Sequence, residues 1–181
     1  SGIGMSPIML ASTYVLTMAL TLSLSPVARA AGLIDYPGGR KTHINPTPMT
    51  GGLGIYLGLI SFCILSPVLM AQYQILLLLS GLVLITGVID DLYDTRASVR
   101  LLLHASAALA MALFADVRLA TLGSLFFGAP IQLGILSLPL TAFATVGVIN
   151  AVNMSDGLDG LSSGLVTIAL GFLSLSAMVA D

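Results

Sequence analysis

The chain has 181 residues and a formal net charge of −2 at pH 7. Hydrophobic residues make up 57% of it and charged residues 8%, and its mean hydropathy is +1.06. A water-soluble globular domain usually carries about 25% charged residues. The composition therefore excludes a water-soluble globular domain and predicts a chain embedded in a lipid bilayer. No nucleic-acid partner is expected.

Charge-free stretches define the predicted helices in chain order. They cover residues 1–28, 44–89, 101–115, 119–155 and 160–180, and most are long enough for the roughly 20 residues that cross the hydrocarbon core. The second stretch must fold back once, and Pro67 with the polar segment MAQYQ around Gln72 marks the break. The sequence therefore predicts six transmembrane helices, at residues 6–26, 52–70, 74–90, 99–115, 134–151 and 160–179.

The first hydrophobic stretch ends in VARAAG, which is similar to a signal-peptidase site. However, no Lys or Arg precedes it, and its apolar core is longer than the 7 to 15 residues of a signal peptide. A retained helix is therefore the favoured interpretation. Cys63 is the single cysteine, so no disulfide can form within the chain.

The basic residues predict the orientation in the membrane, because they favour cytoplasmic loops. Five of the six fall on one side of a six-span path: Arg29, Arg40, Lys41, Arg96 and Arg100. Six of the eight acids fall on that side too: Asp35, Asp90, Asp91, Asp94, Asp156 and Asp159. The expected fold is an all-α integral membrane protein, one polytopic domain over residues 1–181. It has polar cytoplasmic loops and a short hairpin-like segment on the other face.

The third loop reads VIDDLYDTRASVR, residues 88–100. Three aspartates crowd the C-terminal end of a helix, where the macrodipole is already negative and like charges three or four residues apart repel. A positive partner is therefore required. One interpretation uses Arg96 and Arg100, with Asp94 capping the next helix. The other is a divalent cation, because Mg²⁺ binds a few carboxylates together with phosphate oxygens.

The first loop reads GLIDYPGGRKTHINPTPMTGG, residues 32–52. Its Gly and Pro residues forbid a continuous helix, so the backbone is free to wrap a ligand. The two glycines at 51–52 open the next helix, where backbone N–H groups attract anions. Arg40, Lys41 and His43 add cationic donors, although Arg40 and Lys41 could equally anchor the topology while His43 is solvated.

The fifth loop reads NAVNMSDGLDGL, residues 150–161, and repeats amides and carboxylates every third residue. A helix start is one interpretation, with Asn153 or Ser155 as the N-cap and the following acids complementing the helix dipole. That leaves Asn150 without a role. Spacing of three places the side chains roughly along one face of a helix or turn, which favours a site for a metal or for a base and a sugar.

These three segments together resemble the polyprenyl-phosphate N-acetylhexosamine-1-phosphate transferases. The motifs DxPxxRKxH with TP and GG, DDxxD, and NxxNxxDGxDGL occur in that order, in alternate loops of one side. The likeness, closest to the bacterial undecaprenyl-phosphate N-acetylglucosamine branch, also includes LGSLFFG at residues 122–128. One departure is His104, where relatives carry Gln, and we interpret it as a packed helix histidine.

The resemblance implies a bacterial inner-membrane enzyme that acts on the cytoplasmic face in the first membrane step of cell-surface polysaccharide synthesis. It would transfer N-acetylglucosamine-1-phosphate, or a related N-acetylhexosamine-1-phosphate, from a UDP-sugar to undecaprenyl phosphate and release UMP. Mg²⁺, with Mn²⁺ as an alternative, would bridge the pyrophosphate. Members have ten or eleven spans, so the chain corresponds to their N-terminal half and is expected to be inactive alone. Membrane lipid surrounds it, and a homodimer stays open.

The resemblance also implies residue roles. Asp90 and Asp91 would be catalytic, one of them deprotonating or orienting the lipid phosphate, but the sequence leaves open which carboxylate does this and which binds metal. The substrate-binding residues would be Lys41, His43, Asn150, Asp156 and Asp159. The metal ligands would be Asn153, Asp94 and Asp156.

Two other classes have related sequence features. An ion-coupled transporter also places carboxylates in its spans, but near mid-membrane, whereas these lie at helix ends on one side. A membrane prenyltransferase of the aromatic-substrate type shares aspartate-rich cytoplasmic loops, but should have two such motifs and no NxxNxxDGxDGL. Both remain alternatives to the transferase.

Overall fold

The computed structural model describes residues 7–36, 45–124, 128–155 and 161–180. Helices dominate this part of the chain. The first three are α1 (Pro7–Ser23), α2 (Ser25–Ala30) and α3 (Gly51–Ile64). They are followed by α4 (Pro67–Tyr93), α5 (Ala97–Phe114), the 3₁₀ turn η1 (Gly134–Leu136), α6 (Ser137–Ser155) and α7 (Leu161–Ala180). The expectation of an all-α membrane fold is confirmed.

Five helical segments are long and apolar enough to cross a bilayer: Ile8–Ala30, Pro67–Tyr93, Ala97–Phe114, Gly134–Ser155 and Leu161–Met178. They match the predicted spans one, three, four, five and six. The remaining helix, α3, has 14 residues. At about 1.5 Å rise per residue it is shorter than the roughly 30 Å hydrocarbon core. With α1 and α2 counted as one segment, the described residues contain six apolar helical segments, of which α3 is too short to cross alone.

The break in the second stretch was predicted in the wrong place. Instead of at MAQYQ, α3 ends at Ile64 and α4 already begins at Pro67. Proline suits a first helical position, where its missing N–H would be unpaired anyway. The Ser66 hydroxyl caps this start by accepting from the backbone N–H of Leu69. Gln72 then lies inside α4, exposed, because a polar side chain on an outer face does not interrupt a helix.

Close packing joins α3 to the helices on either side of it. A Cβ atom added at Gly54 would lie 1.9 Å from the Thr21 hydroxyl of α1, and one added at Gly58 would lie 1.9 Å from that of Thr17. Glycines four residues apart therefore let two helix backbones approach, as in small-xxx-small membrane contacts. On the other side, the Tyr56 hydroxyl donates to the carbonyl of Leu77 in α4 at 2.9 Å.

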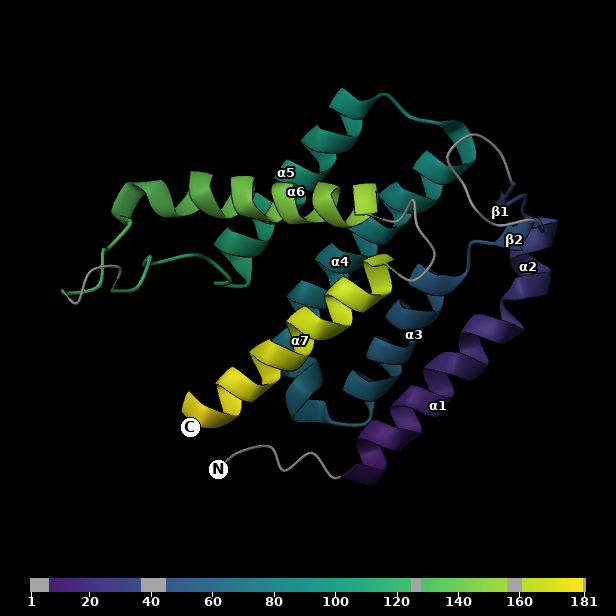
Figure 1. The fold of residues 1–181 in the computed structure, drawn as a ribbon, viewed down its shortest axis with the longest axis horizontal. Coiled ribbons are helices and arrows are strands. Elements are labelled where there is room, and N and C mark those ends of the chain that lie inside the picture. The colour runs from purple at the N-terminus through teal and green to yellow at the C-terminus, as the bar shows by residue number, and fades with distance from the viewer. Residues whose placement is uncertain (1–6, 37–44, 125–127, 156–160, 181) are drawn as a thin grey trace.

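Two short strands, which the sequence did not predict, follow α2. β1 (Ile34–Asp35) pairs antiparallel with β2 (Thr47–Pro48), with Ile34 opposite Pro48 and Asp35 opposite Thr47. Figure 1 places these strands, the end of α4 and the end of α6 toward the right-hand side of the view. The turn between α3 and α4 and the end of α7 lie toward the lower edge. The two strands and the ends of α4 and α6 thus lie toward the same side of this view.

The segment between α5 and α6 is hairpin-like, as predicted. The backbone N–H of Leu122 donates to the carbonyl of Ile131 at 3.0 Å, and Thr121 forms an antiparallel bridge with Gln132. Backbone hydrogen bonds across the segment reduce the number of peptide groups that need other partners at this end of the molecule.

Candidate active site

The acidic end of α4 carries three of the predicted site residues. Asp94 is the C-cap of this helix and adopts a left-handed backbone conformation with φ 47°, and its N–H donates to the carbonyl of Asp90 at 2.8 Å. Asp is one of the few residues besides Gly that adopt this conformation readily. Asp90 is half-buried, whereas Asp91 and Asp94 are exposed. The carboxylates therefore lie at the negative end of a 27-residue helix.

The Asp90 clamp, which we define as Asp90, Thr95 and Arg100, joins α4 to α5. Arg100 Nη1 donates to Asp90 Oδ2 and forms an ion pair with it. Both the backbone N–H of Thr95, at 3.2 Å, and the Thr95 hydroxyl donate to Asp90 Oδ1. The predicted cationic partner Arg100 is thus present for one of the three acids. Thr95 was missed, although a Thr shortly after a helix-ending Asp was a usable signal.

One detail of the arginine interpretation was wrong. Asp94 does not cap the next helix, because it is the C-cap residue of α4 itself. The N-cap position of α5 is Arg96, which makes no side-chain capping bond and is exposed. The connection between the two helices is so short that the residue after Asp94 contacts Asp90 instead.

The first-loop motif begins and ends at the paired strands. Asp35, the first residue of the motif, lies in β1, and β2 leads through buried Thr50 into α3 at Gly51. The predicted opening of α3 by the glycine pair is confirmed. Arg40, Lys41 and His43 lie outside the described residues, between the two strands.

The fifth-loop motif starts inside α6. Asn150 is half-buried and its amide donates to the Val146 carbonyl at 2.8 Å, whereas Asn153 is exposed. The alternative interpretation, with Asn153 or Ser155 as the N-cap of the next helix, is wrong, because both residues lie in the last turn of α6. Asp156 and Asp159 lie outside the described residues.

The donor set has the chemistry that Mg²⁺ requires. Within the described ranges, no three His, Cys, Asp or Glu side chains converge as metal ligands. The Asp94 carboxylate and the Asn153 amide oxygen, two of the three predicted ligands, are exposed hard-oxygen donors, which suit Mg²⁺ better than nitrogen or sulfur does. Exposed ligands of this kind fit a metal that also binds substrate phosphates.

His104 is a packed helix histidine, as interpreted from the sequence. It is 5% exposed, and its Nδ1 atom has no hydrogen-bond partner in the described part of the chain. It lines a cavity of about 200 Å³ between α4, α5 and α6, together with Ser80 and Thr145. The lining is otherwise apolar, so His104 lies between packed helices rather than with the exposed carboxylates.

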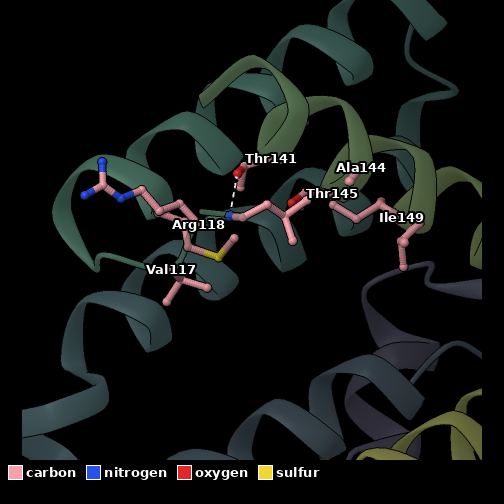
Figure 2. A pocket seen from close by; sticks show the side chains of 9 residues that line it. Val117, Arg118, Thr141, Ala144, Thr145 and Ile149 are labelled. Atoms are coloured by element: carbon pink, nitrogen blue, oxygen red, sulfur yellow. Dashed lines mark hydrogen bonds between the residues drawn. The ribbon is translucent and has the colours of Figure 1, made fainter. Parts of the chain in front are cut away.

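A further cavity, of about 390 Å³, lies between α6 and the segment that follows α5. Figure 2 shows Thr141 accepting a hydrogen bond beside this cavity, from the backbone N–H of Leu119 at 2.9 Å. The Arg118 guanidinium extends away from the other labelled residues (Figure 2) and pairs with Asp116 at 3.2 Å. The cavity therefore presents mainly apolar side chains and carries none of the predicted site residues.

Comparison with known proteins identifies a family for this chain. Residues 73–181, more than half of the chain, match the profile described as "Glycosyl transferase family 4". The chain therefore belongs to glycosyltransferase family 4.

Curated relatives carry more specific names. The chain is 30% identical to an undecaprenyl-phosphate alpha-N-acetylglucosaminyl 1-phosphate transferase of Yersinia pestis, over 90% of this chain and 44% of that protein. The protein of the same name from Escherichia coli K12 is 30% identical over 92% of this chain and 45% of its own length. A probable undecaprenyl-phosphate N-acetylglucosaminyl 1-phosphate transferase of Bacillus subtilis is 28% identical over 91% and 47%.

The chain thus spans less than half the length of these relatives. No solved structure matches it.

Proposed function

We propose that the chain contributes to transfer of N-acetylglucosamine-1-phosphate, or a related N-acetylhexosamine-1-phosphate, from a UDP-sugar to undecaprenyl phosphate. UMP is the other product. The observation that carries this proposal is the acidic end of α4, where one carboxylate is held by Arg100 and Thr95 and two others are exposed. Family membership and the names of the relatives support it.

The proposed roles follow from the resemblance of the three loop motifs to the transferase family. Asp90 or Asp91 accepts the proton of the lipid phosphate or orients it, while Asp94, Asn153 and Asp156 are ligands for Mg²⁺, with Mn²⁺ as an alternative. When bound, the cation neutralises charge on the UDP pyrophosphate and on the leaving UMP. Lys41 and His43 contact phosphate, and Asn150, Asp156 and Asp159 bind the nucleotide sugar.

We further propose that these groups face the cytoplasm of a bacterial cell. Five of the six basic residues lie in the same predicted loops or on the same side of the membrane, and basic residues favour cytoplasmic loops. The test replaces exposed Arg96 or exposed Ser124 with cysteine in a Cys63→Ser background. An impermeant thiol reagent should label Arg96→Cys only from the cytoplasmic face and Ser124→Cys only from the opposite face. Labelling of both from one side would contradict the proposed topology.

Activity is tested by transfer of radiolabelled sugar phosphate from UDP-N-acetylglucosamine to undecaprenyl phosphate with Mg²⁺. Because the chain covers less than half of its relatives, two proteins are compared: the chain itself, and the chain joined to any continuation that its gene encodes. We expect transfer by the joined protein and none by the chain alone. Absence of product from the joined protein with every UDP-N-acetylhexosamine tested would reject the proposed function.

A further inference from the structure

The Asp90 clamp makes more bonds than the turn between α4 and α5 requires. Backbone hydrogen bonds lie on both sides of this turn, because the Asp94 N–H donates to the Asp90 carbonyl at 2.8 Å. In the first turn of α5 the N–H groups of Val99 and Arg100 donate to the carbonyl of Arg96. The Asp90 side chain adds one bond to the turn backbone, from the Thr95 N–H, and two further bonds from side chains. Together these three bonds fix the position of one carboxylate.

The geometry leaves Asp90 with room for one more partner. A carboxylate has about four acceptor positions, and Thr95 and Arg100 fill three of them: the hydroxyl and N–H of Thr95 on Oδ1, and Arg100 Nη1 on Oδ2. The Asp90 side chain is 17% exposed. Ligand can therefore reach it, but the carboxylate cannot turn freely.

Arg100 acts on Asp90 specifically. Its side chain is 24% exposed, and within the described residues its buried Nε atom has no hydrogen-bond partner, so the Nη1 contact is the polar contact that holds the guanidinium. The charge is needed here because Asp90 adjoins Asp91 and Asp94 at the negative end of α4. Arg96, four residues earlier, is exposed and belongs to no such contact.

We propose that Thr95 and Arg100 are positioning residues, which hold the Asp90 carboxylate in one orientation with a single acceptor position directed to the substrate phosphate. This inference rests on the proposed transferase function. It assigns Asp90 a fixed direction toward the substrate.

The test measures kcat and KM in the joined protein, the chain together with any continuation that its gene encodes. Two matched substitutions of arginine by glutamine are compared. Arg100→Gln should lower kcat about 100-fold, the effect of misplacing a reacting group by about 1 Å, and change the KM for UDP-sugar less than about threefold. Arg96→Gln removes the same charge from the same turn and should leave kcat within about twofold. Equal losses in both variants would overturn the proposal in favour of a general need for positive charge.

Conservative replacements distinguish a role in positioning Asp90 from a role in filling space. Arg100→Lys keeps the charge and should recover about tenfold of the loss, but not all of it, because lysine lacks the planar guanidinium geometry. Thr95→Ser keeps both donors and should be more active than Thr95→Val. No difference between the serine and valine variants would remove Thr95 from the proposal.

A thermal readout makes failure of this inference distinguishable from failure of the proposed function. Arg100→Gln leaves Asp90 charged and uncompensated, so its Tm should fall, and adding Asp90→Asn should restore part of the fall. If these shifts occur but Arg100→Gln transfers sugar phosphate normally, the positioning role is wrong while the transferase function stands. If the unchanged protein makes no product, both are wrong, whatever the Tm values.

Discussion

Two polar clusters, one at each end of α5, differ in how completely their groups are used. At one end is the Thr141 network, which we define as Leu119, Ser137 and Thr141. The Thr141 hydroxyl donates to the Ser137 carbonyl at 2.6 Å and accepts from the Leu119 N–H, and the Ser137 hydroxyl donates to the Leu119 carbonyl at 2.6 Å. Its two hydroxyl side chains are buried and uncharged.

The other end holds the Asp90 clamp, which is charged and adjoins two exposed carboxylates, Asp91 and Asp94. In the Thr141 network both hydroxyl donors are used within the protein, and two hydrogen bonds join Leu119, after α5, to α6. Three carboxylates gather at the acidic end, where the helix dipole is already negative, and two of them are exposed. Exposed carboxylates are accessible to a ligand, whereas the buried hydroxyl groups of the Thr141 network are not, so we expect structure from one cluster and chemistry from the other.

The largest expected effect is loss of transfer at the acidic end. Asp91→Asn in the complete protein should lower sugar-phosphate transfer by about 10³-fold or more, within the range lost with a positioned acid–base group, and Asp90→Asn should do the same. Neither should impair membrane insertion, because removing a like charge relieves repulsion. Radiolabel transfer across a Mg²⁺ titration measures this.

Asp116→Asn provides the control, because it removes an exposed acid from the opposite end of α5. It should leave transfer unchanged. Normal turnover in Asp91→Asn and Asp90→Asn would mean that the acidic end is structural, and the comparison between the two clusters would collapse.

A smaller effect is expected on stability at the neutral end. Thr141→Val removes the acceptor of the Leu119 N–H, a part-buried hydrogen bond, which should cost about 0.5–1.5 kcal/mol of unfolding free energy. Thr141→Ser keeps the hydroxyl and should cost less. Unfolding in detergent measures both, and transfer per folded molecule should not change. A fall in transfer without a fall in stability would give this network a functional role.

Asp94→Gly should separate backbone strain from metal binding. Because Asp94 has φ 47°, a conformation that costs most L-residues about 1–2 kcal/mol, glycine should raise stability by up to about 1 kcal/mol. If Asp94 is a Mg²⁺ ligand, the same variant should need more Mg²⁺ for half-maximal transfer. Asp94→Asn, which tolerates the same backbone, controls for the charge. An unchanged Mg²⁺ dependence in both would remove Asp94 from the proposed ligands.

Hydropathy predicted the fold well because a segment that crosses a bilayer must satisfy its own backbone hydrogen bonds, which few structures besides a helix can do. Charge-free stretches gave the long helices to within a few residues, apart from the break near Pro67. That error arose because Gln72 was read as a turn residue, whereas a long helix can carry glutamine on an exposed face. Pro67 was the correct signal, but it marks the first residue of α4 rather than a position near the end of α3.

The candidate site was predictable where charge alone decides a contact. Three adjacent acids required a cation, and Arg100 supplies one. The sequence could not choose between Arg96 and Arg100, because that depends on where α5 begins. Thr95 and Thr141 were missed for a related reason: a hydroxyl takes its meaning from the backbone group that it reaches, and the partner of Thr141 is 22 residues away.

The smallest expected effect comes from repeating the Arg100 substitution at the neutral end. Arg118→Gln breaks an ion pair with Asp116 whose side chains are 50% and 85% exposed. Such surface pairs contribute less than about 1 kcal/mol, so both Tm and transfer should stay close to those of the unchanged protein. Arg100→Gln is chemically the same change, made at a pair whose side chains are 24% and 17% exposed. If the two variants behave alike, burial adds nothing to the Asp90 clamp; if only Arg100→Gln fails, the shielded geometry of Asp90 is what the protein requires.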